Sequence, residues 1–195
     1  RLPAEHAAFL TRSASPNNLA VAAQYVSLLG AVEDDVVACF LEGGGVPYDR
    51  FERFHEVMAE DSDQTVLSAL LTDFVPLVPG LEERLEAGIR VLDLGCGRGR
   101  ALLMLADRYP RSSFVGLDLS AAAIRYARSR AEDAGLANVR FEERDLRTFD
   151  VDAEPGAFDL VTTFDAVHDQ PAPPSLLAGI RRTLAAGGVY LMQDI

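Results

Sequence analysis

The sequence has no tryptophan and no lysine, and it contains only two cysteines and three histidines. Cys39 and Cys96 are single and far apart, so we expect neither a disulfide framework nor a metal site. The chain also lacks a signal peptide and any apolar run long enough to cross a bilayer. We therefore expect a cytoplasmic protein with no membrane partner.

Positive charge is scarce as well. Acidic residues outnumber lysine plus arginine by 30 to 18, which gives a formal net charge of -12. This balance disfavours an extended surface for nucleic acid, so we expect no nucleic-acid partner. The length of 195 residues suits one globular domain with an appendage. Because the chain begins with Arg1 and has no initiating methionine, we expect the natural protein to be longer.

What the sequence does have is a glycine-rich stretch at residues 91–100, VLDLGCGRGR. Residues 89–94 are mostly apolar, as is typical of a strand buried on both faces of a parallel sheet. Apolar residues at helical spacing follow the glycines, so the pattern predicts a strand, a tight turn and a helix. Glycines let a ligand approach the backbone closely, and the N–H groups that open the helix favour an anionic group on it.

The spacing of the glycines separates this turn from other nucleotide-binding turns. A dinucleotide fingerprint fails because its last glycine is replaced by Arg100, and a phosphate-binding loop needs a lysine. The pattern D-x-G-x-G-x-G resembles motif I of the class I S-adenosylmethionine (SAM)-dependent methyltransferases. This resemblance implies that Gly95, Cys96 and Gly97 pack against the methionine part of SAM. It also implies that Asp93 helps to hold the amino group of SAM.

Later segments fit the same resemblance. We predict four more strands, at residues 114–117, 139–146, 158–165 and 187–192. Asp118 and Leu119 end the second strand, about twenty residues past the glycine turn, where a carboxylate accepts hydrogen bonds from ribose hydroxyls. The alternative is that Asp118 only caps the next helix, although Ser120 is already a plausible cap. The resemblance implies that Asp145 and Leu146, at the end of the third strand, lie beside the adenine of SAM.

Two candidates lie at the end of the fourth strand. Phe164 is predicted to stack near the cofactor, the alternative being a core position. His168 could remove the proton of an acceptor hydroxyl, because its usual pKa is near neutral and Asp169 could orient it. The alternative is that His168 only packs in the loop that follows the strand. We predict His168 as the catalytic residue.

Residues 1–88 read as a helical cap, and residues 89–195 as the SAM-binding domain. The predicted cap helices span residues 3–10, 17–29, 32–41, 47–60, 65–74 and 81–87, with Asn17 or Asn18 capping the second. Further helices are predicted at 120–134 and 174–184, and a polar loop at 149–156. The fold class is a Rossmann-like, doubly wound, mainly parallel α/β sheet with an N-terminal helical cap. Class I methyltransferases usually continue beyond a fifth strand, so we expect a fragment of a longer chain.

The cap carries a second resemblance. Residues 45–48 and 54–62 look like the helices that precede the sheet in plant-type O-methyltransferases. They look closer still to those of bacterial methyltransferases with an amino-terminal winged-helix domain. The resemblance implies a homodimer of the full-length protein, formed largely by parts outside this sequence.

The sequence therefore predicts methyl transfer from SAM to a small-molecule acceptor, with S-adenosylhomocysteine (SAH) as product and a hydroxyl oxygen as the favoured target. Residues 165–168 read D-A-V-H, unlike the Asn/Asp-Pro-Pro-Tyr of methylases that act on nucleic-acid bases. Two alternatives stay open: a SAM-binding sensor without catalysis, and a nucleotide-sugar or dinucleotide enzyme with a similar fold.

Overall fold

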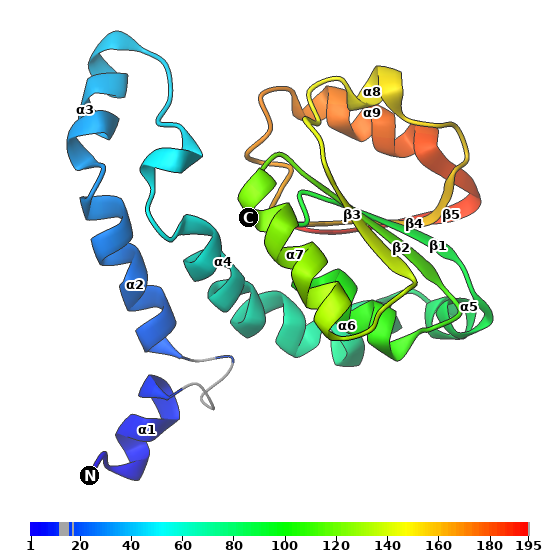
Figure 1. The fold of residues 1–195 in the computed structure, drawn as a ribbon, viewed down its shortest axis with the longest axis horizontal. Helices are drawn as coiled ribbons and strands as arrows, with labels where there is room; N and C mark the ends of the chain where they lie inside the picture. The colour runs from blue at the N-terminus through cyan, green and yellow to red at the C-terminus, as the bar shows by residue number, and fades with distance from the viewer. Residues whose placement is uncertain (12–15, 17, 195) are drawn as a thin grey trace. The chain divides into compact units, whose positions relative to one another are not determined.

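The computed structural model describes residues 1–11, 16 and 18–194. It divides into two compact units, the first spanning Arg1–Ala69 and the second beginning at Leu70, and each is described by itself (Figure 1). The sequence places the change from cap to sheet at residue 88. By compactness, the helical residues 70–88 group with the sheet.

The described residues of the first unit form helices and loops without strands. Its helices are α1 (Ala4–Leu10), α2 (Leu19–Gly30), α3 (Glu33–Glu42), α4 (Phe54–Ser62) and the short turns η2 (Tyr48–Arg50) and η3 (Asp63–Leu67). Asn18 caps α2 by accepting a hydrogen bond from the Ala20 N–H at 3.0 Å, whereas Asn17 lies outside the described residues. The helix predicted over 47–60 is interrupted, because Arg53 adopts a left-handed conformation with φ 61°.

The second unit opens with three helical segments, η4 (Leu70–Phe74), η5 (Val75–Leu77) and α5 (Leu81–Ala87). The stretch predicted as one helix over 65–74 is helical but widens into π turns in η3 and η4. Leu81 and Leu85 are completely buried, and the Ser112 hydroxyl donates to the Leu85 carbonyl at 2.7 Å. These contacts join α5 to the sheet unit.

Five parallel strands form the sheet in the order β3-β2-β1-β4-β5, which confirms the predicted Rossmann-like fold. The strands are β1 (Arg90–Leu94), β2 (Ser113–Asp118), β3 (Val139–Glu143), β4 (Phe158–Phe164) and β5 (Leu184–Gln193). The helices of this unit are α6 (Arg100–Arg108), α7 (Ala121–Asp133), α8 (Phe149–Asp152) and α9 (Pro173–Thr183). Helices α6 and α7 cover one face of the sheet, and α8 and α9 cover the other (Figure 1). Parallel strands with helices on both faces bring all five carboxyl ends to one edge, where ligands bind in such folds.

The prediction of a polar loop over 149–156 is wrong at its start. Phe149 opens the short helix α8 and is only 2% exposed, because its ring and carbonyl fill the space above Gly179 of α9. A Cβ added at Gly179 would lie 2.5 Å from Phe149 Cδ1. Phe149 belongs to the core between the sheet and these helices, together with Leu92, Leu117, Val161, Leu176 and Ile180.

The fifth strand also differs from its prediction. It begins at Leu184, before the glycines that were expected to precede it. Leu184 pairs with Phe158 and Val189 pairs with Leu160, so the residues between them form an irregular bulge, in which Gly187 has φ 75°. The glycines therefore lie inside the strand.

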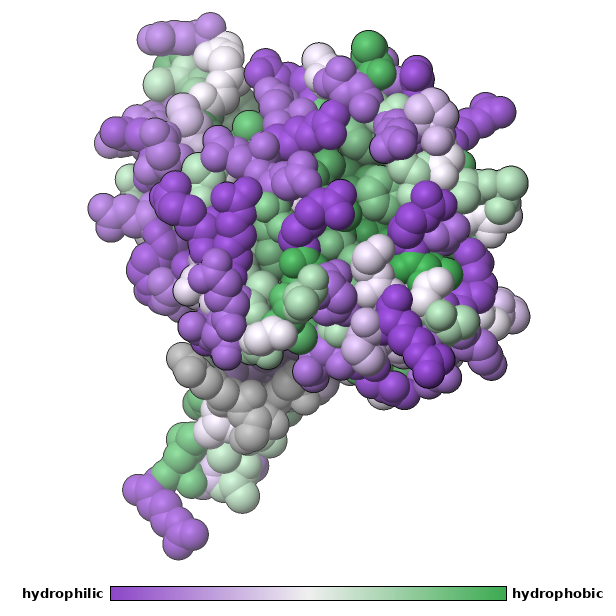
Figure 2. Space-filling view, turned by 45° about the vertical axis from the view of Figure 1, so that its right-hand side comes forward, coloured by the Kyte–Doolittle hydropathy of each residue, from purple (hydrophilic) through white to green (hydrophobic). Residues whose placement is uncertain are grey.

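The described chain has no single helix long and apolar enough to span a membrane; residues 54–77 and 81–87 reach that length only as a bent pair. On the face drawn in Figure 2, hydrophilic residues predominate and hydrophobic ones lie between them.

Candidate active site

The glycine turn joins β1 to α6, as predicted, and its three glycines serve two purposes. Gly95, Gly97 and Gly99 all have left-handed φ angles, of 74°, 52° and 69°. A Cβ at Gly95 would lie 2.6 Å from the Ala166 Cβ, and one at Gly99 would lie 2.4 Å from the Phe141 ring. At Gly97 an added Cβ would meet nothing within 4 Å. Packing inside the protein thus requires two of the glycines, and the third leaves open space beside the turn.

Asp118, at the end of β2, holds this turn. Its Oδ2 accepts the Gly97 N–H and its Oδ1 accepts the Ser120 N–H, both at 2.8 Å. The N–H groups of Gly95 and Cys96 both donate to the Leu117 carbonyl. These three N–H groups of the turn therefore already have protein acceptors, and the anionic ligand group expected at the N–H groups that open α6 stays a prediction.

Ser120 caps α7, as the sequence predicts, by accepting the Ala123 N–H at 3.2 Å. Asp118 is thus not the side-chain cap of that helix. Leu119, between them, is 59% exposed at the same edge of the sheet.

Asp93 is a buried acid, only 3% exposed, and the Thr162 hydroxyl donates to its Oδ1 at 2.8 Å. Burial, with a smaller contribution from the negative charge of Asp118, raises the pKa of Asp93 to about 7, against the opposing hydrogen bond from Thr162. Burial also raises the pKa of the Cys96 thiol, so this thiol stays protonated and is a poor nucleophile. A cationic group placed beside Asp93 would favour its charged form.

The residues after β3 separate into an exposed acid and a core side chain. Asp145 accepts the Arg147 backbone N–H at 2.9 Å and its Nε–H at 2.7 Å, and these hydrogen bonds lower the pKa of Asp145. Leu146 is 6% exposed and packs in the core between the sheet and α8–α9. Any contact of Leu146 with a ligand would therefore involve its backbone.

Phe164, the last residue of β4, stacks on Phe74, with ring centroids 6.3 Å apart and an angle of 18° between the ring planes. Both rings are half-buried. Phe74 was not predicted to be near the site, because it lies in η4, far from β4 in sequence.

The loop after β4 brings four polar side chains together. Asp165 has a left-handed φ of 48°, unusual for a residue other than glycine. Its backbone N–H donates to the Gln193 carbonyl at 2.9 Å, and the Gln193 Nε2 donates to its Oδ1 at 3.0 Å. His168 Nδ1 contacts Asp194 Oδ1, and the Val167 N–H donates to Asp194 Oδ2 at 3.0 Å. Asp194 therefore connects the end of β5 to the loop that follows β4.

These carboxylates set the charge state of His168. The hydrogen bond to Asp194 raises the pKa of His168 above its usual 6.5, and the charges of Asp169, Asp194 and Asp165 raise it further. Asp169, which the sequence indicated as the orienting acid, lies 3.5 Å from Nε2 on the other side of the ring. Asp194 was missed. One signal could have pointed to it: the other strands carry an acidic residue at or next to the carboxyl end, and Asp194 directly follows β5.

One group of described side chains has a spacing compatible with a metal ion. Ligand atoms of Asp165, His168 and Asp194 all lie within 4.8 Å of one another. The sequence predicts no metal. His168 is hydrogen-bonded to Asp194, and Asp165 is hydrogen-bonded to Gln193.

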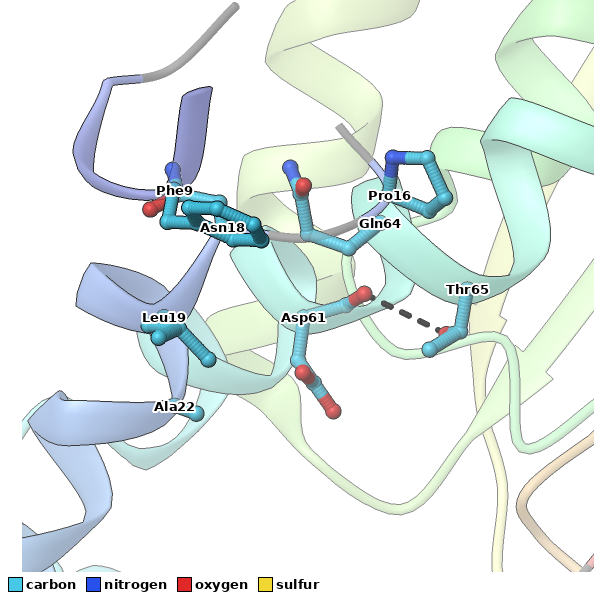
Figure 3. A pocket seen from close by; sticks show the side chains of 8 residues that line it. All are labelled: Phe9, Pro16, Asn18, Leu19, Ala22, Asp61, Gln64 and Thr65. Atoms are coloured by element: carbon cyan, nitrogen blue, oxygen red, sulfur yellow. Dashed lines mark hydrogen bonds between the residues drawn. The ribbon is translucent and has the colours of Figure 1, made fainter. Parts of the chain in front are cut away.

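A hollow lies within the first unit and contains none of the predicted site residues. It has a volume of about 300 Å³. Figure 3 shows α1 and α2 on one side and α4 and η3 on the other, with the Thr65 hydroxyl donating to the Asp61 carbonyl at 3.2 Å. Its lining residues are Phe9, Pro16, Asn18, Leu19, Ala22, Asp61, Gln64 and Thr65.

Comparisons with known proteins point to one family. A family model described as a methyltransferase domain matches residues 85–195. A trans-aconitate 2-methyltransferase of Deinococcus radiodurans is 38% identical over 126 residues, which are 65% of this chain and 43% of that protein. A fatty-acid O-methyltransferase of Mycolicibacterium smegmatis is 34% identical over 55% of this chain and 37% of its own length. The chain thus spans less than half the length of these curated relatives.

Among solved structures, PKMT2 from Rickettsia typhi in complex with AdoHcy is 30% identical, with a TM-score of 0.50. The match covers 56% of this chain and 21% of that one.

Proposed function

The chain belongs to the methyltransferase domain family and has the fold of the class I SAM-dependent enzymes, and on this premise we propose that it transfers a methyl group from SAM to a hydroxyl oxygen of a small-molecule acceptor. One observation carries the proposal. The glycine turn and the histidine loop are in contact, since Ala166 fills the space above Gly95. The predicted cofactor residues and the predicted base thus lie at one edge of the sheet.

The residues at the turn fit SAM. When bound, SAM supplies an electrophilic methyl group and leaves as SAH. The open space at Gly97 accommodates the methionine part beside the turn, and buried Asp93 holds the cationic amino group. Asp118 keeps further lone pairs for ribose hydroxyls after accepting its two backbone hydrogen bonds. Asp145 and the backbone at Leu146 take the adenine end. The bound AdoHcy of the Rickettsia relative supports this cofactor.

His168 acts as the base for an acceptor hydroxyl. An ionised Asp194 can only accept a hydrogen bond, so it holds the proton on Nδ1 and leaves Nε2 able to take the hydroxyl proton. Asp194 itself is held by the Val167 N–H. Three carboxylates raise the pKa of His168, and the same charges oppose an anionic acceptor. This environment supports a neutral hydroxyl over a carboxylate.

Calorimetric titration with SAH tests the proposal. We expect the wild-type chain to bind SAH, and Asp118→Ala to bind it at least about tenfold more weakly, because it loses the acceptor for ribose hydroxyls and for Gly97 N–H. Asp107→Ala removes an exposed carboxylate on α6 and is the matched control. A folded wild type that binds no SAH would overturn the proposal. SAH binding without methyl transfer to any of a panel of alcohols and phenols would favour a sensor.

A further inference from the structure

We propose that Phe74 is a further residue of the methyl-donor site, where it forms with Phe164 an aromatic pair that recognises the positive charge of the SAM sulfonium. This inference rests on the proposed function and extends it to a residue outside the glycine-turn and strand-end motifs. It assigns the π turn η4 a role at the site.

The two rings form a defined contact. Their centroids are 6.3 Å apart, and their planes are tilted by only 18°, an offset stacked arrangement. Both side chains are half-buried, so part of each ring remains accessible at the edge of the sheet. A pair that served only the core would be expected among the buried residues, and neither phenylalanine belongs to the buried core between the sheet and α8–α9.

The position of the pair follows from the neighbours of Phe164. Phe164 ends β4, and Ala166, two residues on, packs against Gly95 of the glycine turn. The pair is therefore at the edge where β1 and β4 end. These strands are adjacent in the sheet, and Asp93 on β1 is hydrogen-bonded to Thr162 on β4.

Buried residues on both sides of Phe74 in the sequence fix its position. Leu70 at the start of η4 is 1% exposed, and Val75, directly after Phe74, is 2% exposed. The π turn of η4 lies between these buried anchors. Single π turns in helices are often found at functional sites, where the widened turn repositions a side chain.

Chemistry explains why aromatic rings suit this place. The face of a phenylalanine ring attracts a cation, and aromatic rings are used to recognise small organic cations. The sulfonium of SAM carries a positive charge, and the thioether of SAH does not. A carboxylate in this position would attract the sulfonium but could also compete as a nucleophile for its methyl group, whereas an aromatic ring attracts the cation and offers no such nucleophile. The pair therefore favours the donor over the product.

The test compares SAM and SAH binding to two variants at one position. In Phe74→Leu, which keeps an apolar side chain and loses the ring, we expect SAM to bind about 3- to 30-fold more weakly and SAH to change by less than about threefold. Phe74→Trp keeps a π face and should bind SAM as the wild type does. Leu77→Ala, at a 70% exposed position in the next turn, is the matched control.

Phe74→Trp provides a second readout, because the sequence has no other tryptophan. Its indole fluorescence should change when SAM is added, with the same midpoint as the calorimetric titration. If Phe74→Leu weakens SAM and SAH equally, or changes neither, or if the indole fluorescence of Phe74→Trp does not respond to SAM, the inference is wrong while the proposed function stands. If the folded wild type binds neither ligand, both fail.

Discussion

Asp93 is an acid whose surroundings strongly oppose its charged form. Its pKa is about 7 in the folded chain, where burial is the main cause, against a usual value of 3.8. Between these pH values the folded state binds more protons than the unfolded state, so stability falls as the pH rises through this window. The stabilisation is complete below pH 3.8 and lost above pH 7. A carboxylate kept at this cost is consistent with a partner cation in the bound state.

We therefore expect Asp93→Asn to make the free protein more stable than the wild type at pH 8.5, by about 1–3 kcal/mol. The asparagine carbonyl still accepts the hydrogen bond from Thr162, and no charge is buried. The gain should shrink at low pH, where the wild-type acid is already neutral. Urea unfolding of the variant and the wild type, at pH 8.5 and at low pH, measures this difference in stability. An equal gain at the two values would show that charge is not the cause. The same variant should bind SAM more weakly.

His168 provides a second pH-dependent signal. The hydrogen bond to Asp194 raises its pKa above the usual 6.5, so Asp194→Asn should lower that pKa towards the usual value. Proton NMR can follow the titration, because the chain has only three histidines and His168→Gln identifies the resonance by its loss. Asp169→Asn, on the other side of the ring, should lower the pKa less than Asp194→Asn does. If the two variants have the same effect, Asp194 does not hold His168 in the way we describe.

At the scale of elements, helix α8 depends on one glycine of α9. A Cβ at Gly179 would lie 2.5 Å from the Phe149 ring and 2.7 Å from its carbonyl oxygen, and that backbone atom cannot rotate away. We expect Gly179→Ala to destabilise the protein by about 1–3 kcal/mol through overpacking. Gly30→Ala is the control, since its added methyl meets nothing within 4 Å at the end of α2. Thermal unfolding compares the two. A neutral Gly179→Ala would mean that α8 moves away at little cost.

The elements that the sequence predicts correctly are those with a strong local pattern of apolar residues. The strands β1 and β4 can be predicted because strands buried on both faces are apolar at nearly every position. Helix α6 can be predicted because its apolar residues recur at helical spacing. Helix α8 was missed because its four residues are too few for periodicity, and its cause, Gly179, lies on another helix. The pairing of His168 with Asp194 was missed because it, too, depends on a residue that is distant in sequence. It depends on the parallel register of β4 and β5, which brings distant residues together.

At the scale of the whole molecule, the sequence places the change from helical cap to sheet at residue 88, whereas the two compact units divide after Ala69. Residues 70–88 have the same helical pattern as the residues before them. By compactness they group with the sheet, and Leu70, Leu81 and Leu85 among them are buried. The homodimer and the cytoplasmic location stay predictions.

The two units differ in how much they bury, and this predicts a difference in local stability. Helix α3 has no buried residue, and Phe40 on it is 87% exposed. Strand β1 has four consecutive buried residues and hydrogen-bonded neighbours on both sides. Segments with few buried apolar contacts open at low free energy cost, whereas core strands open only with the whole unit.

Hydrogen exchange followed by mass spectrometry should therefore show α3 amides exchanging at least about a hundredfold faster than those of β1. Helix α2, which buries Val21 and Leu28, should lie between them and serves as the internal control. Saturating SAH should slow exchange further in the glycine turn and after β4, and leave α3 unchanged if the ligand binds where we propose. Protection of α3 equal to that of β1 in the free chain would show that something covers its exposed apolar side chains in solution.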